Sequence, residues 1–237
     1  MELSELRRIK SKIQSVNPQR WRGDDFDVRF YLISQLKTLK NSKILDVDGG
    51  IGIICSEIPE SNFVVNSDIS FKDLLKARGF LTFENFSVTM TDLPFSNSSF
   101  DYVIYSHLIE VAKYIDLQQN NPKFPTIEKM LSEINRVLKN GGLLILTTPN
   151  NEFYKTEKLD YNELKNSLKN HFTDISLKFF NTYPKLSSRY RKLNLANVIP
   201  KLLSKITEKE KILNNLLRQD KGKSMSSVSF YVEARKI

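Results

Sequence analysis

Residues 43–52 read KILDVDGGIG, and residues 63–70 read FVVNSDIS. The first stretch predicts a buried strand that ends in acidic residues and is followed by a glycine-rich turn opening a helix. Glycine in such a turn permits positive φ and lets a ligand approach the backbone, and amides at a helix start bind polar ligand groups. The second stretch predicts a neighbouring strand that ends at Asp68, where a carboxylate can accept both hydroxyls of a ribose. Together they predict a nucleoside-binding cradle.

Outward from this segment, short apolar runs alternate with helical or polar stretches. The runs are KILDVD, FVVNSD, FSVTM, FDYVIYS and LLILTTP, followed by a strand through 175–180 and a last strand, SVSFYVEAR. This alternation is typical of βαβ units. It predicts an α/β fold, Rossmann-like and doubly wound, with a mostly parallel sheet. Helices are expected at 126–138, which Gly141 ends, and at 162–169.

The chain is expected to form one domain over residues 1–237. Residues 1–40 read as two helices separated at Asn17-Pro18, residues 41–180 form the core, and residues 228–237 form the last strand. Residues 181–227 read as a helical insertion with an apolar stripe and a lysine face. That insertion could pack on the edge of the sheet, close as a lid over an acceptor, or touch a membrane surface as a peripheral contact.

Composition excludes several classes of site. The single cysteine, Cys55, excludes an intramolecular disulfide, and with only two histidines beside it the usual Cys/His metal site is excluded, so no metal is expected. No window is apolar enough to span a membrane, and the amino terminus lacks the apolar region of a secretory signal, which predicts a cytoplasmic protein. The net charge of +9 fits either attraction to polyanions or simple solubility.

Two further stretches give the sequence a family resemblance. Residues 92–111 read DLPFSNSSFDYVIYSHLIEV, and residues 133–150 read EINRVLKNGGLLILTTPN. With the glycine-rich segment and the closing FYVEARK, they resemble, in order and spacing, the motifs of the class I S-adenosylmethionine-dependent methyltransferases, in the type 11 branch. The resemblance covers roughly residues 40–180. It implies a seven-stranded sheet with an antiparallel last strand and S-adenosylmethionine as cofactor.

The resemblance also implies roles for individual residues. Asp46 would support the glycine loop and the amino end of the methionine, Asp68 would hold the ribose, and Ile69 would lie against the adenine. The remaining cofactor-binding candidates are the loop residues Asp48, Gly49, Gly50 and Gly52, and the residues along the edge of the base, Thr91, Asp92 and Leu93. The alternative for Asp68 is an acid at the amino end of a helix that begins at Ser70.

Three positions depart from the family pattern. Asp48 stands where the family has the first glycine of the loop. Its carboxylate would face the carboxylate of methionine, or it would turn aside or contact the positive ammonium or sulfonium group. Thr89 falls where many relatives carry an acid for the adenine amino group, and Val111 stands where relatives often show His. These departures make a degenerate cofactor site the main alternative.

His107 and Glu110 are the candidate catalytic residues, because they follow the fourth strand at the edge where doubly wound folds bind ligands. His107 can act as a general base near neutral pH, or it can cap the strand and pack beside the cofactor. Glu110 can contact substrate or simply lie on a helix surface. Methyl transfer is an in-line displacement that depends mainly on positioning, so a base is not obligatory. Cys55 reads as a core residue.

The sequence therefore predicts a methyltransferase that acts on a small-molecule, lipid or glycan acceptor. The first alternative is a methyltransferase-like binding or scaffold protein with a degenerate cofactor site. The second is an RNA methyltransferase, which the charge favours but which no RNA-binding appendage or catalytic RNA-methyltransferase motif supports.

Overall fold

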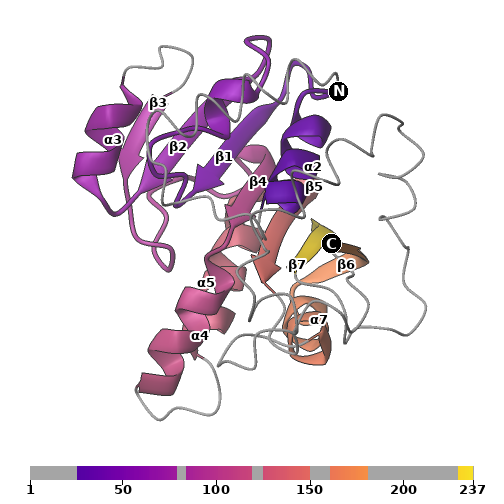
Figure 1. The fold of residues 1–237 in the computed structure, drawn as a ribbon. Helices are drawn as coiled ribbons and strands as arrows, with labels where there is room; N and C mark the ends of the chain where they lie inside the picture. Colours follow the sequence, from indigo (N-terminus) through magenta and orange to yellow (C-terminus); the bar gives the residue numbers. More distant parts are fainter. Residues whose placement is uncertain (1–25, 79–83, 119–124, 150–160, 181–228, 237) are drawn as a thin grey trace, which may run out of the picture.

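The computed structural model describes residues 26–78, 84–118, 125–149, 161–180 and 229–236. Within them, seven strands form one sheet in the order β3-β2-β1-β4-β5-β7-β6 (Figure 1). The helix expected before Asn17 and the insertion expected at 181–227 lie outside the described residues. The strands and their bounds are β1 (Lys43–Val47), β2 (Phe63–Asp68), β3 (Glu84–Ser87), β4 (Phe100–Ser106), β5 (Leu138–Pro149), β6 (Phe172–Phe180) and β7 (Ser229–Lys236).

The sheet has the predicted mixture of strand directions. β1 pairs in parallel with β2 and β4, and the parallel pairing continues to β3 on one side and to β5 on the other. β7 lies between β5 and β6 and is antiparallel to both. The prediction of a doubly wound, mostly parallel seven-stranded sheet with an antiparallel last strand is confirmed. Parallel pairing brings the carboxyl ends of β1, β2, β4 and β5 to one edge, where such folds bind ligands.

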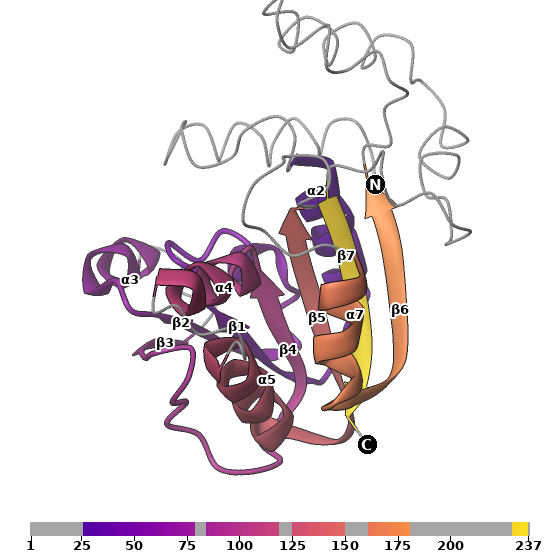
Figure 2. The same ribbon diagram turned by 90° about the horizontal axis from the view of Figure 1, so that it is seen from below.

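Helices cover both faces of this sheet, as Figure 2 shows. α2 (Phe26–Leu36) packs on one face with Ile44, Val64 and Ile104, and the central part of this cluster is almost fully buried. The helices α4 (Ile109–Gln118), α5 (Pro125–Val137) and α7 (Tyr161–Lys169) cover the other face, around Leu45, Val103 and Leu144. α3 (Phe71–Ala77) follows β2 and contacts β2 and β3. Alternate residues of β1 and β4 therefore enter opposite cores.

The helix expected directly after the glycine loop is not formed. Successive turns follow β1 instead, and they lead into a short 3₁₀ helix, η1 (Cys55–Glu57). Gly52 has φ 72°, which no α-helix accommodates, and only six residues separate it from Pro59. Three of those six are isoleucine, and β-branched residues lower helix propensity. Cys55 is buried in the core beneath α2, as expected for a packing residue.

Other boundaries shift by a few residues. β3 begins at Glu84 and ends at Ser87, earlier than the predicted FSVTM strand. β5 begins at Leu138, five residues before the predicted apolar run, because Leu138 pairs with Phe100 across an irregularity in the ladder. α4, which was not among the helices expected from the sequence, extends from Ile109 to Gln118. The predicted helices at 126–138 and 162–169 are present as α5 and α7.

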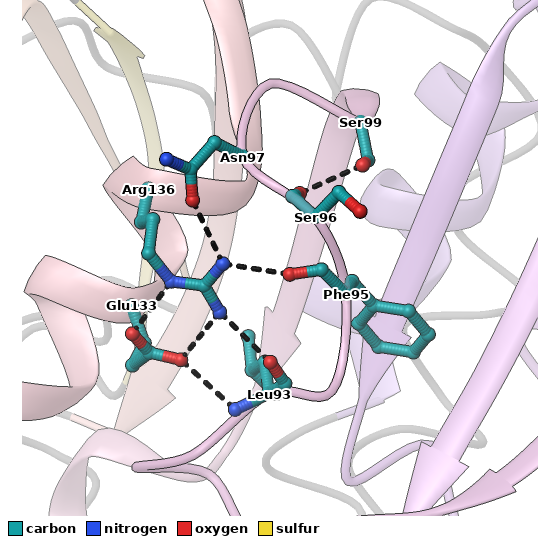
Figure 3. Close-up of polar contacts among 7 residues, drawn as sticks. All are labelled: Leu93, Phe95, Ser96, Asn97, Ser99, Glu133 and Arg136. Atoms are coloured by element: carbon teal, nitrogen blue, oxygen red, sulfur yellow. Dashed lines mark hydrogen bonds and ion pairs between the residues drawn. The ribbon is translucent and has the colours of Figure 1, made fainter.

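One side-chain cluster fixes the loop between β3 and β4 against α5 (Figure 3). The Arg136 guanidinium donates to both oxygens of Glu133, at 2.8 Å each, and to the carbonyl oxygens of Leu93 and Phe95, at 2.8 and 2.6 Å. It also donates to Oδ1 of Asn97 at 3.0 Å. Glu133 in turn accepts from the amide of Leu93. Since bidentate Arg–carboxylate pairs are geometrically specific, the cluster sets the position of the loop.

Candidate functional site

A cavity of about 540 Å³ opens at the carboxyl ends of β1 and β2. Its walls come from the ends of these strands, the segment after β3, and the helices α4 and α5. The described residues that line it are Val47, Asp48, Asp68, Ile69, Val88, Thr89, Met90, Thr91, Leu108, Val111, Ile115, Thr126 and Lys129. Two carboxylates thus lie at the sheet edge of a mainly apolar cavity, and one lysine lies on its α5 side.

Four predicted cofactor-binding residues line this cavity: Asp48, Asp68, Ile69 and Thr91. Ile69 is 70% exposed, so its apolar side chain is available to a ligand. The predicted residues that are not among the lining residues are Asp46, Gly49, Gly50, Gly52, Asp92, Leu93, His107 and Glu110. The roles of all these residues remain predictions, and their surroundings differ considerably.

The turn after β1 has the backbone geometry expected of a ligand-binding loop. Asp48, Gly50 and Gly52 all have positive φ, at 58°, 59° and 72°. Aspartate tolerates this left-handed region better than most residues, which accounts for its occupying a position where glycine is usual. The Gly49 amide donates to the carbonyl oxygen of Ser67 at 3.0 Å, which ties the loop to the end of β2.

Gly49 is required by the protein interior. A Cβ at this position would lie 2.2 Å from Oδ1 of Asn66 and 2.7 Å from Oδ2 of Asp46, both side-chain atoms beneath the loop. Real Cβ atoms do not approach this closely, so any side chain at Gly49 would displace the loop or the buried polar pair. The sequence pattern attributed the three glycines to ligand approach. At Gly49 the structure gives a packing reason as well.

We expect Gly49→Ala to destabilise the protein by about 2 kcal/mol, because small-to-large changes in packed sites cost about 1–3 kcal/mol. Urea denaturation measures this difference. Gly141→Ala is a suitable control, because Gly141 has φ 74° but no atom within 4 Å of its added Cβ. The free energy of unfolding of Gly141→Ala should fall by only about 1 kcal/mol, which is the backbone cost of a non-glycine residue at positive φ. Equal losses in the two variants would contradict the packing explanation.

Asp68 fits the role predicted for it by position and by remaining hydrogen-bonding capacity. Its Oδ2 accepts from the Gly50 amide at 2.8 Å, and its Oδ1 accepts from the Ser70 amide at 2.7 Å. Ser70, the neighbouring residue, caps α3 through its own side chain. A carboxylate has about four acceptor positions, so two remain for the hydroxyls of a ligand. Asp68 therefore links the glycine loop, the start of α3 and the cavity.

Asp46 points to the other face of the sheet. It is fully buried, its Oδ2 accepts from Cys55 Sγ at 3.3 Å, and its Oδ1 has no hydrogen-bond partner among the described residues. The pKa of Asp46 is raised from 3.8 to about 7: burial is the main cause and the charge of Asp68 adds to it, while the Cys55 hydrogen bond and Arg29 act in the opposite direction. Burial likewise raises the pKa of the Cys55 thiol. Asp46 therefore lies beneath the loop, between Gly49 and Cys55.

The segment after β3 contributes one wall of the cavity. Thr89 and Asp92 form an isolated antiparallel bridge around Met90 and Thr91. The Leu93 side chain is buried in the core, and its amide is bonded to Glu133. Thr89, Met90 and Thr91 of this segment line the cavity, whereas Leu93 anchors the segment in the core.

His107 and Glu110 lie together beyond the end of β4, with Nδ1 of His107 3.5 Å from Oε1 of Glu110. Thr148, near the end of β5, donates from Oγ1 to the other Glu110 oxygen at 3.0 Å. His107 has φ 61°, and its amide donates to the carbonyl oxygen of Thr147. The two predicted residues are thus brought together, and the structure adds Thr148, which the sequence analysis did not single out.

Sequence reasoning also missed the contributions of the two helices to the cavity. Ile115 in α4 and Thr126 and Lys129 in α5 line it. Helical periodicity marks which residues are buried, but it does not show which polar residue of a helix faces a cavity. Among the described residues, no group of three or more His, Cys, Asp or Glu side chains could hold a metal ion. The described helices also include none that is long and apolar enough to cross a membrane.

Comparison with known protein families agrees with the resemblance to methyltransferases that the sequence motifs indicate. Residues 45–146 match the model of a family described as a methyltransferase domain, the type 11 methyltransferases. Comparison with curated protein sequences gives no match.

Solved structures share the fold at low sequence identity. A SAM-dependent methyltransferase from Thermotoga maritima is 15% identical with a TM-score of 0.58, covering 98% of this chain and 100% of that one. Phosphoethanolamine N-methyltransferase 2 from Haemonchus contortus, solved with S-adenosyl-L-methionine, is 16% identical with a TM-score of 0.56, covering 89% of this chain and 52% of that one. The cyclase SpnF is also similar, at 16% identity and a TM-score of 0.54, covering 89% and 80% of the two chains. At this identity the likeness concerns the fold. Residues 45–146 therefore match a methyltransferase domain, and the chain shares the fold of S-adenosylmethionine-dependent methyltransferases.

Proposed function

We propose that this protein binds S-adenosylmethionine in the cavity at the ends of β1 and β2 and transfers its methyl group to a small-molecule, lipid or glycan acceptor. The observation that carries the proposal is the placement of two carboxylates, Asp48 and Asp68, at the sheet edge of a mainly apolar cavity of about 540 Å³. S-adenosylmethionine combines a flat base, two vicinal hydroxyls and two positive centres. The residues present fit each of these parts.

Asp68 is placed to hold the ribose. Both of its oxygens already accept one backbone amide, which fixes the carboxylate in place, and each retains capacity for one more donor. A carboxylate that is oriented in advance loses little entropy when it binds a hydroxyl pair. Asp48 would then lie on the methionine side, where an anion can attract the ammonium or sulfonium group.

Apolar side chains are placed to enclose the base. Ile69 and Val88 follow β2 and β3, and Met90 and Leu108 lie on the same cavity. A flat heteroaromatic ring buried between such side chains gains the apolar contact typical of ligand sites. The family's acid for the adenine amino group has no counterpart at Thr89, and the polar lining residues besides the two carboxylates are Thr89, Thr91, Thr126 and Lys129.

When bound, S-adenosylmethionine supplies an electrophilic methyl group on a sulfonium. The contribution of the chain is to bind and orient the two reactants, which can supply most of the acceleration of an in-line displacement. The acceptor is proposed to reach the methyl group from the ends of β4 and β5, where His107 and Glu110 lie. SpnF has a similar fold and is named a cyclase, so the reaction has to be tested directly.

Binding of the demethylated product tests the proposal. S-adenosylhomocysteine at about 100 times its dissociation constant should stabilise the protein by about 2.7 kcal/mol. For a chain of this size that raises the melting temperature by about 5–10 °C in a thermal shift measurement. Asp68→Asn should lose most of this stabilisation, while Asp73→Asn, whose carboxylate pairs with Lys76 in α3, should retain it. The absence of any shift in the native chain would favour the degenerate, scaffold-like alternative.

A further inference from the structure

One buried imidazole nitrogen beyond the end of β4 has no partner. Nε2 of His107 is enclosed, and none of the residues that the structure describes offers it a hydrogen bond. Leaving a buried polar atom unpaired costs about 1–3 kcal/mol, and native proteins rarely retain such atoms without a reason. The other ring nitrogen, Nδ1, lies 3.5 Å from Oε1 of Glu110. Among the described residues, the ring therefore has a carboxylate beside Nδ1 and no hydrogen-bond partner at Nε2.

The occupied side is held by a chain of contacts that reaches β5. Glu110 accepts from Thr148 Oγ1 at 3.0 Å, and the Thr148 side chain is fully buried. Glu110 also lies in the first turn of α4, where the helix dipole favours a negative charge. These two interactions position the Glu110 carboxylate beside the imidazole. A separation of 3.5 Å is long, but hydrogen bonds of reactive groups are often long in the absence of ligand.

The backbone supports the same orientation. His107 has φ 61°, which costs a non-glycine residue free energy, and its amide donates to the carbonyl oxygen of Thr147 at 2.8 Å. The hydroxyl group of Ser106, at the end of β4, lies 3.0 Å from the hydroxyl group of Thr147 in β5. Strained residues persist where surrounding contacts over-determine them, and they cluster at functional sites.

The chemistry of the pair sets the tautomer of His107. An ionised carboxylate only accepts hydrogen bonds, so Glu110 selects the form with its proton on Nδ1. Nε2 then carries the lone pair and can only accept. A group that completes the site must therefore bring a hydrogen to Nε2.

We propose that His107 is the catalytic base, that Glu110 and Thr148 are its positioning residues, and that the methyl acceptor carries an exchangeable O–H or N–H group. This inference rests on the proposed function and narrows its substrate class. The proton of the acceptor passes to Nε2 of His107, and the electron pair left on the acceptor atom forms the bond to the methyl carbon. The pair of the broken carbon–sulfur bond stays on sulfur, and Glu110 faces the resulting imidazolium. A carbon acceptor or a thioether without such a hydrogen does not fit this site.

Nitrogen-15 NMR of the full chain tests the inference without an acceptor. The chain has only two histidines, and His171 is an internal reference because its Nε2, not its Nδ1, contacts Glu128, at 2.8 Å. At about pH 8, where an ordinary imidazole is neutral, we expect His107 to be protonated on Nδ1 and His171 on Nε2. The substitution His107→Gln assigns the signals. A native His107 with its proton on Nε2 would overturn the proposal.

Variants of the positioning residue Thr148 provide a second test of the inference. Thr148→Val removes the hydroxyl that holds Glu110, so the His107 Nε2 signal should move upfield toward the protonated form, whereas Thr148→Ser should retain the native signal. Unchanged His171 signals show that each variant is folded. A His107 signal that is the same in Thr148→Val and in the native chain would refute the positioning role.

Calorimetry with S-adenosylhomocysteine separates the two proposals. Thr148→Val should bind it with an unchanged dissociation constant, because Thr148 is not among the residues that line the cavity. A native chain that fails to bind it would overturn the proposed function whatever the NMR result. Normal binding together with the wrong tautomer would overturn only the assignment of the base and the acceptor class.

Discussion

The free energy of unfolding of the native protein is expected to fall as the pH rises from about 4 to above 7. Asp46→Asn should remove this fall. The folded-state pKa of Asp46 is raised to about 7 from an ordinary value of 3.8, chiefly by burial. The folded chain therefore holds this proton more tightly than the unfolded chain does. The contribution of this proton to the free energy of unfolding is fully present below pH 3.8 and is lost as the pH rises through about 7.

The loss should be about 4 kcal/mol, because each pKa unit is worth about 1.4 kcal/mol. Urea denaturation at a series of pH values measures it in the native chain and in Asp46→Asn. The variant should show a flatter profile than the native chain and should exceed its stability on the alkaline side. Identical profiles would show that Asp46 does not titrate in this range.

Asp101→Asn provides a control of opposite sign. Asp101 accepts from Lys139 Nζ and from the Lys43 amide, and these contacts hold its pKa below the ordinary value. Its contribution is present above the ordinary pKa and is lost as the pH falls. The variant should therefore lose stability at neutral pH. The effect should be small because Asp101 is about one-third exposed.

The second large effect is expected at Arg136. Arg136→Met should destabilise the protein by about 3 kcal/mol, because it leaves Glu133 and the carbonyl oxygens of Leu93 and Phe95 without their donor. For a chain of this size, the melting temperature should fall by about 6–12 °C. Calorimetric melting measures the difference. Because the cluster also fixes the segment that walls the cavity, affinity for S-adenosylhomocysteine should fall as well.

Lys139→Met serves as the matched control for Arg136. Lys139 pairs with Asp101 at 2.7 Å, but both side chains are more than one-third exposed. Exposed ion pairs contribute about 0–1 kcal/mol, so this variant should melt near the native temperature. Comparable losses in the two variants would show that the contacts to the loop carbonyls contribute nothing beyond an ordinary ion pair.

Much of the fold followed from local pattern. The runs at 63–68 and 100–106 became β2 and β4 with the predicted bounds, because a buried parallel strand is a short apolar run with recognisable ends. The helix after the glycine loop was predicted wrongly. Family pattern and glycine position favoured it, but the left-handed Gly52 and the nearby Pro59 leave no room for a regular helix. Local backbone conformation overrode the motif.

The candidate site was predicted in part. Asp48, Asp68, Ile69 and Thr91 line the cavity, as the resemblance implied that they would line a cofactor site. Asp46 was assigned to the same site, yet its side chain lies beneath the loop with Cys55. Adjacent residues of a strand point to opposite faces, and the sequence does not show which face of β1 leads to the cavity. The contribution of Lys129 depended on the packing of α5 and could not be read from its helical pattern.

By itself the sequence determined the order of strands and helices, the positive-φ turn after β1, and the carboxylate at the tip of β2. These features depend on neighbours within a few residues, through apolar periodicity and the conformational freedom of glycine. Only the tertiary structure decided that Thr148 holds Glu110 against His107, and that Asn66 and Asp46 leave no space for a side chain at Gly49. Those contacts join residues far apart in the chain, and parallel strand pairing alone brings them to one edge of the sheet.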